Sequence, residues 1–189
     1  MSTPFSQDNA AFTDRAHMAA RDHLYPSLFP QSRIEYDRVT SVKTNNRHAI
    51  LDGELAIDVV LHVDMQLPKP MQFTVQERFR KTQYQKFADL TITEWNHATG
   101  LPSELHKLAS DLFVYGYYDE RMHALTEALV IYSAPLKRAL VSKQIMFERR
   151  LNTRSNQSFI TISFDALHEA GVVALHYKMN PVMQKEVVK

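Results

Sequence analysis

The feature of this sequence that most constrains the fold is the length of its apolar runs, each about the size of one β-strand. Even a strongly apolar run such as Leu55–Leu61 is far too short to cross a membrane as a helix. A pattern with helical spacing comes first, several strand-like runs follow, and helical and strand-like segments mix towards the end. This order predicts an α/β chain of the α+β type, in which helices flank a mixed central β-sheet.

The predicted elements follow from this periodicity and from the turn and capping residues between them. We expect helices over residues 7–24, 103–110, 133–147 and 165–168. We expect strands over residues 32–42, 48–51, 55–63, 71–80, 89–95, 112–118, 124–132, 158–164 and 172–177. Pro26 and Pro30 are expected to end the first helix. Because no repeat or linker divides the 189 residues, they predict one domain over 1–189.

Composition excludes several kinds of site. The 4 glycines are too few for a glycine-rich phosphate loop, and the absence of cysteine excludes disulfides, thiolate zinc sites and cysteine nucleophiles. The charge is nearly balanced, with 22 basic and 21 acidic residues, so only local clustering can indicate a nucleic-acid partner. Residues 1–9 are polar and unlike a secretory signal, so we expect a cytoplasmic protein.

Asp58 is the most anomalous residue, because it lies in the middle of the apolar run 55–63. Burying a lone carboxylate is costly, so its charge needs a partner. Strand alternation places Asp58 on the same face as Val60 and His62. Two interpretations are open: a structural carboxylate near the strand end, paired with an arginine or with backbone donors, or a metal ligand at the rim of the sheet.

The next predicted strand, 71–80, carries polar residues near its end. Gln76, Arg78 and Arg80 share one face, and Glu77 lies on the other. Oxygen ligands and a cation beside a carboxylate suit phosphodiester chemistry, in which a divalent ion polarises the phosphate and the cation stabilises developing charge. The other interpretation is a polar strand end whose arginines form ion pairs with Asp37, Asp89 or Glu94.

The segments Ala56-Ile57-Asp58 and Gln76-Glu77-Arg78 resemble the short motifs of the PD-(D/E)XK nuclease superfamily, in particular its phage-associated or uncharacterised branches. Segments 89–94, 103–111, 113–117 and 158–162 resemble later parts of such chains. The resemblance therefore covers most of the chain through short, degenerate motifs. It implies a restriction-endonuclease-like fold and a nuclease that acts on DNA with Mg²⁺ or Mn²⁺ as its cofactor.

Residue by residue, the resemblance implies Asp58 as the central metal ligand, Gln76 at the acidic position and Arg78 at the lysine position. Both of the latter depart from the commonest motif. Gln76 offers a neutral oxygen, which weakens metal binding, and Arg78 carries a fixed charge and cannot release a proton to act as a base.

Other carboxylates complete the implied site. Glu77 would supply the missing carboxylate if a β-bulge redirected its side chain. Glu35 and Asp22 are the upstream candidates for a further ligand. The predicted catalytic residues are Asp58, Gln76, Glu77 and Arg78, and the predicted metal ligands are Asp58, Glu77 and Glu35.

Basic residues cluster in two places. Arg80, Lys81 and Lys86 follow the proposed site and are the predicted DNA contacts, which would contribute salt-dependent affinity without sequence preference. The second cluster, over residues 137–154, has two interpretations: a solvated helix face or a further phosphate-steering surface. Its members are Lys137, Arg138, Lys143, Arg149, Arg150 and Arg154.

Three functions are therefore open. The first is a metal-dependent nuclease acting on DNA, for which the resemblance also suggests pairing of two copies. The second is a catalytically inactive nuclease-like module that binds nucleic acid or protein, which the departures at Gln76 and Arg78 favour. The third is an interaction protein without a nucleic-acid role, which the near-zero net charge favours. None of the three calls for a membrane partner.

Overall fold

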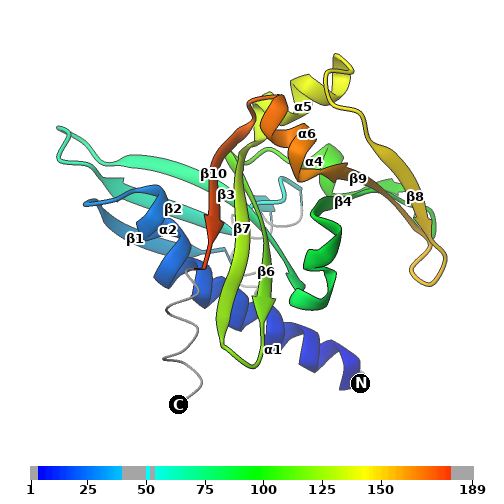
Figure 1. Cartoon of the computed structure of the whole chain (residues 1–189), viewed down its shortest axis with the longest axis horizontal. Helices are drawn as coiled ribbons and strands as arrows, with labels where there is room; N and C mark the ends of the chain where they lie inside the picture. Colours follow the sequence, from blue (N-terminus) through cyan, green and yellow to red (C-terminus); the bar gives the residue numbers. More distant parts are fainter. Residues whose placement is uncertain (1–3, 40–49, 52–53, 180–189) are drawn as a thin grey trace.

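A computed structural model of the chain describes residues 4–39, 50–51 and 54–179 (Figure 1). The helical elements are α1 (Pro4–Ala19), the π-helical η1 (Ala20–Leu24), α2 (Tyr25–Leu28), the 3-10 helix η2 (Thr82–Phe87), α4 (Glu104–Lys107), α5 (Ser133–Val141) and α6 (Phe164–Glu169). The strands are β1 (Arg33–Arg38), β2 (Val59–Asp64), β3 (Met71–Lys81), β4 (Asp89–Asn96), β5 (Leu101–Pro102), β6 (Leu112–Asp119), β7 (Ala124–Tyr132), β8 (Glu148–Asn152), β9 (Gln157–Ser163) and β10 (Val173–Lys178). The predicted α+β class is confirmed.

The strands form two sheets. The larger, six-stranded sheet has the order β1-β2-β3-β6-β7-β10, and its neighbours are antiparallel except β3 and β6, which are parallel. A parallel pair needs a crossover connection, and here the chain crosses through η2, β4, β5 and α4. β4 and β5 join the β8–β9 hairpin in a smaller antiparallel sheet of order β5-β4-β9-β8. In Figure 1 this hairpin projects from one side of the molecule.

One hydrophobic core lies between the larger sheet and the N-terminal helices. The buried helix residues Ala16 and Leu24 belong to the same cluster as Leu61, Val75 and Val114 from strands β2, β3 and β6. The apolar residues of the first helix recur at helical spacing, so they share the side that meets the sheet. α1 and η1 therefore cover one face of β3.

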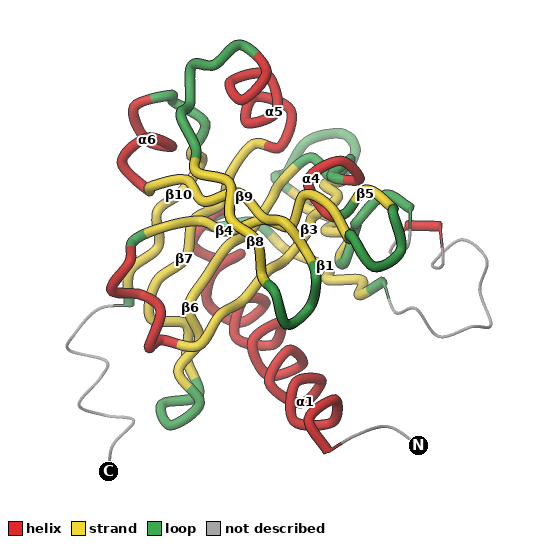
Figure 2. The backbone as a smooth tube through the Cα atoms, turned by 90° about the vertical axis from the view of Figure 1, so that its right-hand side faces the viewer, coloured by secondary structure: helices red, strands yellow, loops and turns green. Residues whose placement is uncertain are grey.

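A second core lies on the opposite face of the larger sheet. Tyr115 of β6 packs there with Ile92 and Ile160 of the smaller sheet and with Leu136 and Leu167 of α5 and α6. These two helices lie together at one end of the molecule, away from the start of α1 (Figure 2). The middle of β3 is therefore covered on both faces, and its alternating side chains enter two different environments.

Most predicted elements are confirmed. The predicted strands 71–80, 89–95, 112–118, 124–132, 158–164 and 172–177 correspond to β3, β4, β6, β7, β9 and β10. The first helix does not end at Pro26 as predicted but continues to Leu28, because α2 begins at Tyr25 and accommodates the proline in its first turn. None of the helices in the described ranges is long and apolar enough to span a membrane.

The predicted strand 55–63 is wrong at its start. β2 begins at Val59, and Ala56 has a left-handed backbone with φ of 49°, which interrupts an extended strand. Asp58 therefore lies just before the strand rather than in its middle. The first two residues of the predicted strand 48–51 lie outside the described residues, and its last two, Ile50 and Leu51, are helical and contradict the prediction.

The predicted helix 133–147 is too long. α5 ends at Val141, Lys143 has a left-handed φ of 60°, and residues 148–152 form the unpredicted strand β8. β8 pairs with β9, so cross-strand contacts that the local pattern does not contain decide its conformation. The predicted helix 103–110 is likewise shortened to α4, Glu104–Lys107.

Candidate functional site

The candidate site is built on the middle of β3, where successive side chains enter opposite layers. Gln76 and Arg78 contact Glu104 of α4, on the side of the smaller sheet, whereas Glu77 contacts His17 of α1. The predicted alternation is therefore confirmed. The register between β3 and β6 runs without a shift from Val75 to Lys81, so no β-bulge redirects Glu77.

On the helix side, the Glu77 carboxylate is enclosed by protein donors. Its side chain is 0% exposed. His17 Nδ1 and the Tyr25 hydroxyl bond to its two oxygens, and the Tyr36 hydroxyl of β1 donates to Oε2 at 3.2 Å. Burial raises the pKa of both tyrosines, and the Glu77 charge raises it further, so both phenols remain protonated donors. This arrangement, which we call the Glu77 cage, leaves the carboxylate no open side for a metal ion.

Asp58 lies at the β2 edge of β3. Its Oδ2 accepts the Glu77 backbone N–H at 2.7 Å, and its own N–H donates to the Val75 carbonyl at 2.9 Å. The accepted N–H belongs to the peptide bond that joins Gln76 to Glu77, so the Asp58 carboxylate lies beside the backbone of this part of β3. One oxygen of Asp58 is thus held by the backbone, in agreement with the structural interpretation, and the side chain stays partly exposed.

On the small-sheet side, Glu104 orients the polar residues of β3. Its Oε2 accepts from Arg78 and, at 3.2 Å, from the Thr93 hydroxyl of β4. Its Oε1 accepts from Gln76 Nε2 at 3.5 Å. The Ser103 hydroxyl donates to Thr93 Oγ1 at 2.9 Å and supports the same network. Glu104 is 12% exposed, so these bonds act in a largely buried setting.

Two side chains near the middle of β3 are of the types that bind a hard divalent cation. Gln76 Oε1 is buried and has no hydrogen-bond partner, because Glu104 binds the other end of the amide. An amide oxygen and the Asp58 carboxylate are the ligand types that Mg²⁺ accepts, and Mg²⁺ usually completes its shell with waters and phosphate oxygens. Within the described residues, no group of three or more His, Asp or Glu side chains could hold a metal ion. A metal site here would therefore have few protein ligands and would need phosphate oxygens of the substrate to complete its coordination shell.

The other predicted metal ligands are not gathered. Glu35 lies next to Tyr36 on β1 and faces the opposite side from the Glu77 cage, across from His62. Asp22 is exposed and pairs with Arg21 at 2.7 Å. Of the predicted trio, Asp58 and Glu77 are neighbours, since the charges of both raise the pKa of Tyr25 and Tyr36, whereas Glu35 lies on the other face of β1.

The predicted DNA contacts are also divided. Arg80 lies on the small-sheet side, 3.6 Å from Asp89 and with its guanidinium 4.2 Å from the centre of the Tyr84 ring. Lys81 points to the helix side and pairs with Glu120 at 2.7 Å. Lys86 is exposed on η2, beside Phe87. The three cations therefore do not form a single patch.

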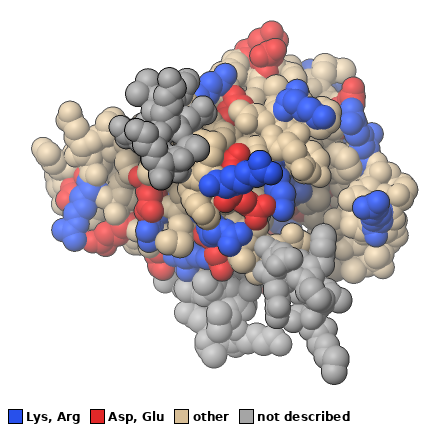
Figure 3. All heavy atoms as spheres, turned by 60° about the horizontal axis from the view of Figure 1, so that its bottom comes forward, with Lys and Arg blue, Asp and Glu red and all other residues tan. Residues whose placement is uncertain are grey.

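Two arginines of the second basic stretch, residues 137–154, form ion pairs with acidic side chains. Arg149 forms two hydrogen bonds to Glu94, at 2.6 and 2.7 Å, which lower the pKa of that carboxyl. Arg150 pairs with Glu148 at 2.6 Å. Figure 3 shows one face of the molecule, on which basic and acidic side chains are interspersed. A solvated strand with ion pairs describes these two arginines better than a phosphate-steering stripe.

Glu104 is the site residue that the sequence did not single out. Ser103-Glu104 reads as a helix start, and that signal explains its local position. Its contact with Arg78 joins residues 26 positions apart through the crossover, which no local pattern contains. No protein-family model, curated protein or solved structure matches the chain.

Proposed function

We propose that the protein is a metal-dependent phosphodiesterase of the nuclease type, acting on DNA at the small-sheet side of β3. The observation that carries this proposal is the buried, unpartnered Gln76 Oε1, one residue before the Glu77 backbone N–H that the Asp58 carboxylate accepts. Buried polar atoms without partners are rare, and they cluster where a ligand is expected. A restriction-endonuclease-like relationship and a cytoplasmic location are parts of the same proposal.

Each residue of the site has a distinct role. Asp58 and Gln76 Oε1 would hold Mg²⁺ or Mn²⁺, which polarises a phosphate and supplies hydroxide near neutral pH. Arg78 would stabilise charge that develops on the phosphorus oxygens. Glu104 is a positioning residue, because it fixes both the Gln76 amide and the Arg78 guanidinium. The ion pair also means that Arg78 must share its donors between Glu104 and the phosphate.

The decisive experiment compares wild type with Asp58→Asn, using Asp64→Asn as the matched control at the exposed end of β2, the strand that follows Asp58. We expect Mg²⁺-dependent cleavage of plasmid or single-stranded DNA to fall by about a hundredfold or more in Asp58→Asn, together with metal binding measured by calorimetry. The control should retain both. Circular dichroism and thermal melting establish that the variants are folded. Wild-type protein that binds neither Mg²⁺ nor Mn²⁺ would contradict the proposal.

A second function is favoured by the Arg78–Glu104 ion pair and the closed Glu77 cage. Both neutralise groups that a nuclease of this type would use, as expected of an inactive module that binds nucleic acid or protein. Such a module would bind DNA without cleaving it, with an affinity that falls steeply with salt. Absence of DNA binding even at low salt would leave an interaction protein without a nucleic-acid role.

A further inference from the structure

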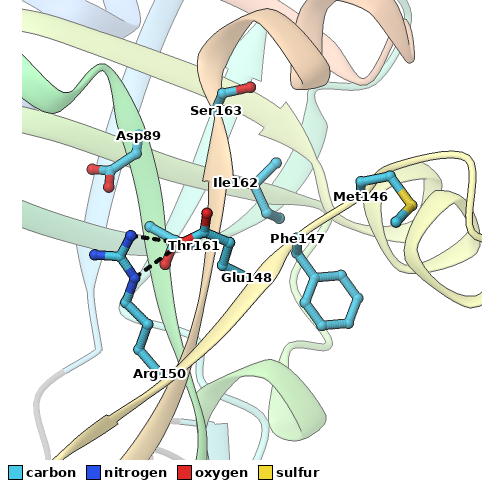
Figure 4. A pocket seen from close by; sticks show the side chains of 8 residues that line it. All are labelled: Asp89, Met146, Phe147, Glu148, Arg150, Thr161, Ile162 and Ser163. Carbon is cyan, nitrogen blue, oxygen red and sulfur yellow. Dashed lines mark hydrogen bonds and ion pairs between the residues drawn. The ribbon is translucent and has the colours of Figure 1, made fainter.

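Two histidines from different elements form a hydrogen bond to each other towards the end of the chain. His168 Nε2 of α6 lies 2.9 Å from His176 Nδ1 of β10, and the ring centres are 5.0 Å apart. His176 also bonds to Glu127 of β7, with 2.7 Å between Nε2 and Oε1. None of the three lines the pocket of about 490 Å³ beside β8 and β9 (Figure 4) or belongs to the site around Asp58 and Gln76. His168 and His176, which we call the histidine pair, are therefore a separate feature of the molecule.

The Glu127 carboxylate acts as an acceptor for several donors. Gln85 Nε2 of η2 donates to Oε2 at 3.0 Å, and Thr126 fixes that amide by donating to Gln85 Oε1 at 3.0 Å. The Lys178 ammonium lies 3.4 Å from Oε1. An ionised carboxylate accepts hydrogen bonds and donates none, so the proton of its bond to His176 lies on Nε2 of that ring.

The bonds of His176 determine where the protons of the pair lie. With its Nε2 proton directed at Glu127, a neutral His176 has only a lone pair at Nδ1, so His168 Nε2–H donates to it. One added proton fits this arrangement, because the other nitrogen of His168 takes it and the bond between the rings becomes charge-assisted. A second does not fit, since both facing nitrogens would then carry hydrogen and both rings a positive charge. The closed pair therefore holds one added proton and excludes two.

The surroundings of the pair do not balance a second charge. The charged groups around it are Glu127 of β7, Lys178 of β10 and, on α6 itself, the exposed Asp165 and Glu169. Within the described residues, neither Asp165 nor Glu169 forms an ion pair with the two rings. One carboxylate with an ammonium beside it does not offset two imidazolium charges. His168 is exposed, so protons from solvent reach the pair.

The pair joins two elements at the end of the second core. α6 contributes the buried Phe164 and Leu167 to that core, and β10 is an edge strand of the larger sheet (Figure 1). Phe164 also packs edge to face on the His176 ring, with centres 5.9 Å apart. With only six residues, α6 is too short to be stable by itself, so its position depends on such contacts.

We propose that the histidine pair is a pH-sensitive latch, which holds α6 on β10 at neutral pH and releases it when both imidazoles are protonated. In mildly acidic solution the closed pair binds one proton, whereas two independent histidines of the unfolded chain bind two. The stability that the latch provides is therefore lost as the pH falls. Unperturbed histidine titrates near pH 6.5, so we expect release between about pH 7 and pH 5. Release would expose Phe164 and Leu167 as an apolar surface.

Hydrogen exchange of the full chain, followed by mass spectrometry at about pH 7.5 and pH 5, tests the latch. After correction for the pH dependence of intrinsic exchange, we expect the protection of residues 164–178 to fall by about tenfold or more at the lower pH. The protection of β3 should stay the same, which separates local release from global unfolding. The proposed cleavage at Asp58 plays no part in this measurement.

His168→Gln distinguishes a latch from a merely structural contact. Its amide can donate to a neutral His176 and accept from a protonated one, so the contact survives at both pH values. We expect the protection of residues 164–178 to resemble that of wild type at neutral pH and to change little in acid. His62→Gln is the matched control, because His62 bonds to a glutamine, Gln72, at 3.1 Å. This control should keep the pH response of wild type.

Nuclear magnetic resonance of the imidazole rings supplies a second readout. In wild type, His168 and His176 should take up their two protons in two separate steps, whereas His176 should titrate in one step in His168→Gln. The proposal is overturned if residues 164–178 of wild type are equally protected at both pH values, if the two rings titrate independently, or if His168→Gln keeps the pH response.

Discussion

The two faces of β3 treat their buried polar groups in opposite ways. On the helix face, the Glu77 carboxylate receives bonds from His17, Tyr25 and Tyr36. On the small-sheet face, Gln76 Oε1 and, further along, Asp89 Oδ1 are buried without a hydrogen-bond partner. A closed network of this kind stabilises the native state, whereas open acceptors cost stability and are typical of sites that bind a ligand.

This difference indicates which polar residues of β3 are structural and which are candidates for function. The Glu77 side chain is fully buried, and a buried carboxylate in a polar strand segment is a natural catalytic candidate. Its hydrogen bonds show instead that it joins α1 and α2 to strands β1 and β3 of the larger sheet. The less buried neighbours on the opposite face retain the unused bonding capacity that chemistry needs.

The largest expected effect follows from opening the Glu77 cage. Glu77→Ala leaves the imidazole of His17 and the hydroxyls of Tyr25 and Tyr36 without their acceptor, and we expect the free energy of unfolding to fall by about 3–5 kcal/mol. Urea denaturation measures it. Glu77→Gln, which keeps one acceptor oxygen, is the control and should lose less. A loss below about 1 kcal/mol for the alanine variant would show that the cage is open in solution.

The stability that each tyrosine hydroxyl of the Glu77 cage contributes should increase with its burial. Tyr25 is fully buried, and Tyr36 is partly buried with a longer bond of 3.2 Å. We expect Tyr25→Phe to cost about 1–2 kcal/mol and Tyr36→Phe about half as much, because the second hydroxyl is better replaced by water. Paired denaturation curves at neutral pH provide the test, and the reverse order would contradict the hydrogen-bond assignment.

On the small-sheet side, we expect removal of a charge to raise the free energy of unfolding, in contrast to the losses expected for the Glu77 cage. The raised pKa of Asp89 means that its ionised form favours the unfolded chain, so its stability contribution is full below the usual aspartate pKa and is lost as pH rises through the folded-state pKa. Asp89→Asn should therefore stabilise the protein by about 1 kcal/mol at pH 7 and by less near pH 4. Thermal melts across this range measure the difference.

Glu94 supplies the matched control for that pH dependence. Its pKa is lowered by the hydrogen bonds from Arg149, so its contribution is present at neutral pH and is lost as pH falls through the folded-state pKa. Glu94→Gln should thus destabilise the protein at pH 7 and approach wild type in acid. If the stability of Asp89→Asn and of Glu94→Gln changes in the same direction with pH, burial is not the main cause of the shifted pKa of Asp89.

Most strands were predictable because the sequence pattern within each strand is enough to identify it. The alternation in β3 places its side chains on the correct faces, and the apolar runs of β6 and β7 identify buried strands, with no knowledge of the partner strands. β8 was missed because its five residues are all exposed and carry no apolar alternation, so only pairing with β9 makes them a strand. The start of β2 was misplaced because a left-handed Ala56 has no sequence signature comparable to that of glycine.

The candidate site was predictable in part for the same reason. Asp58 and Gln76 were found because polar residues beside apolar runs are conspicuous locally. Glu104 and the cage residues His17 and Tyr25 were not, because their roles arise from contacts 26, 60 and 52 positions away. A resemblance to short motifs specifies residue types, but it does not indicate which carboxylates the fold brings together.

The smallest effect is expected at Gln76, and it distinguishes the two faces most sharply. Gln76→Met keeps the shape of the side chain, removes an oxygen that has no partner and removes one long bond of 3.5 Å to Glu104. We expect stability without metal to change by no more than about 0.5 kcal/mol, in contrast to the loss at Tyr25. Added Mg²⁺ should stabilise wild type by binding the native state but leave the variant unchanged. Thermal melts with and without Mg²⁺ measure both quantities. A variant that is destabilised by more than about 1 kcal/mol without metal would mean that Oε1 already has a partner in solution, and the metal site would then have to be placed elsewhere.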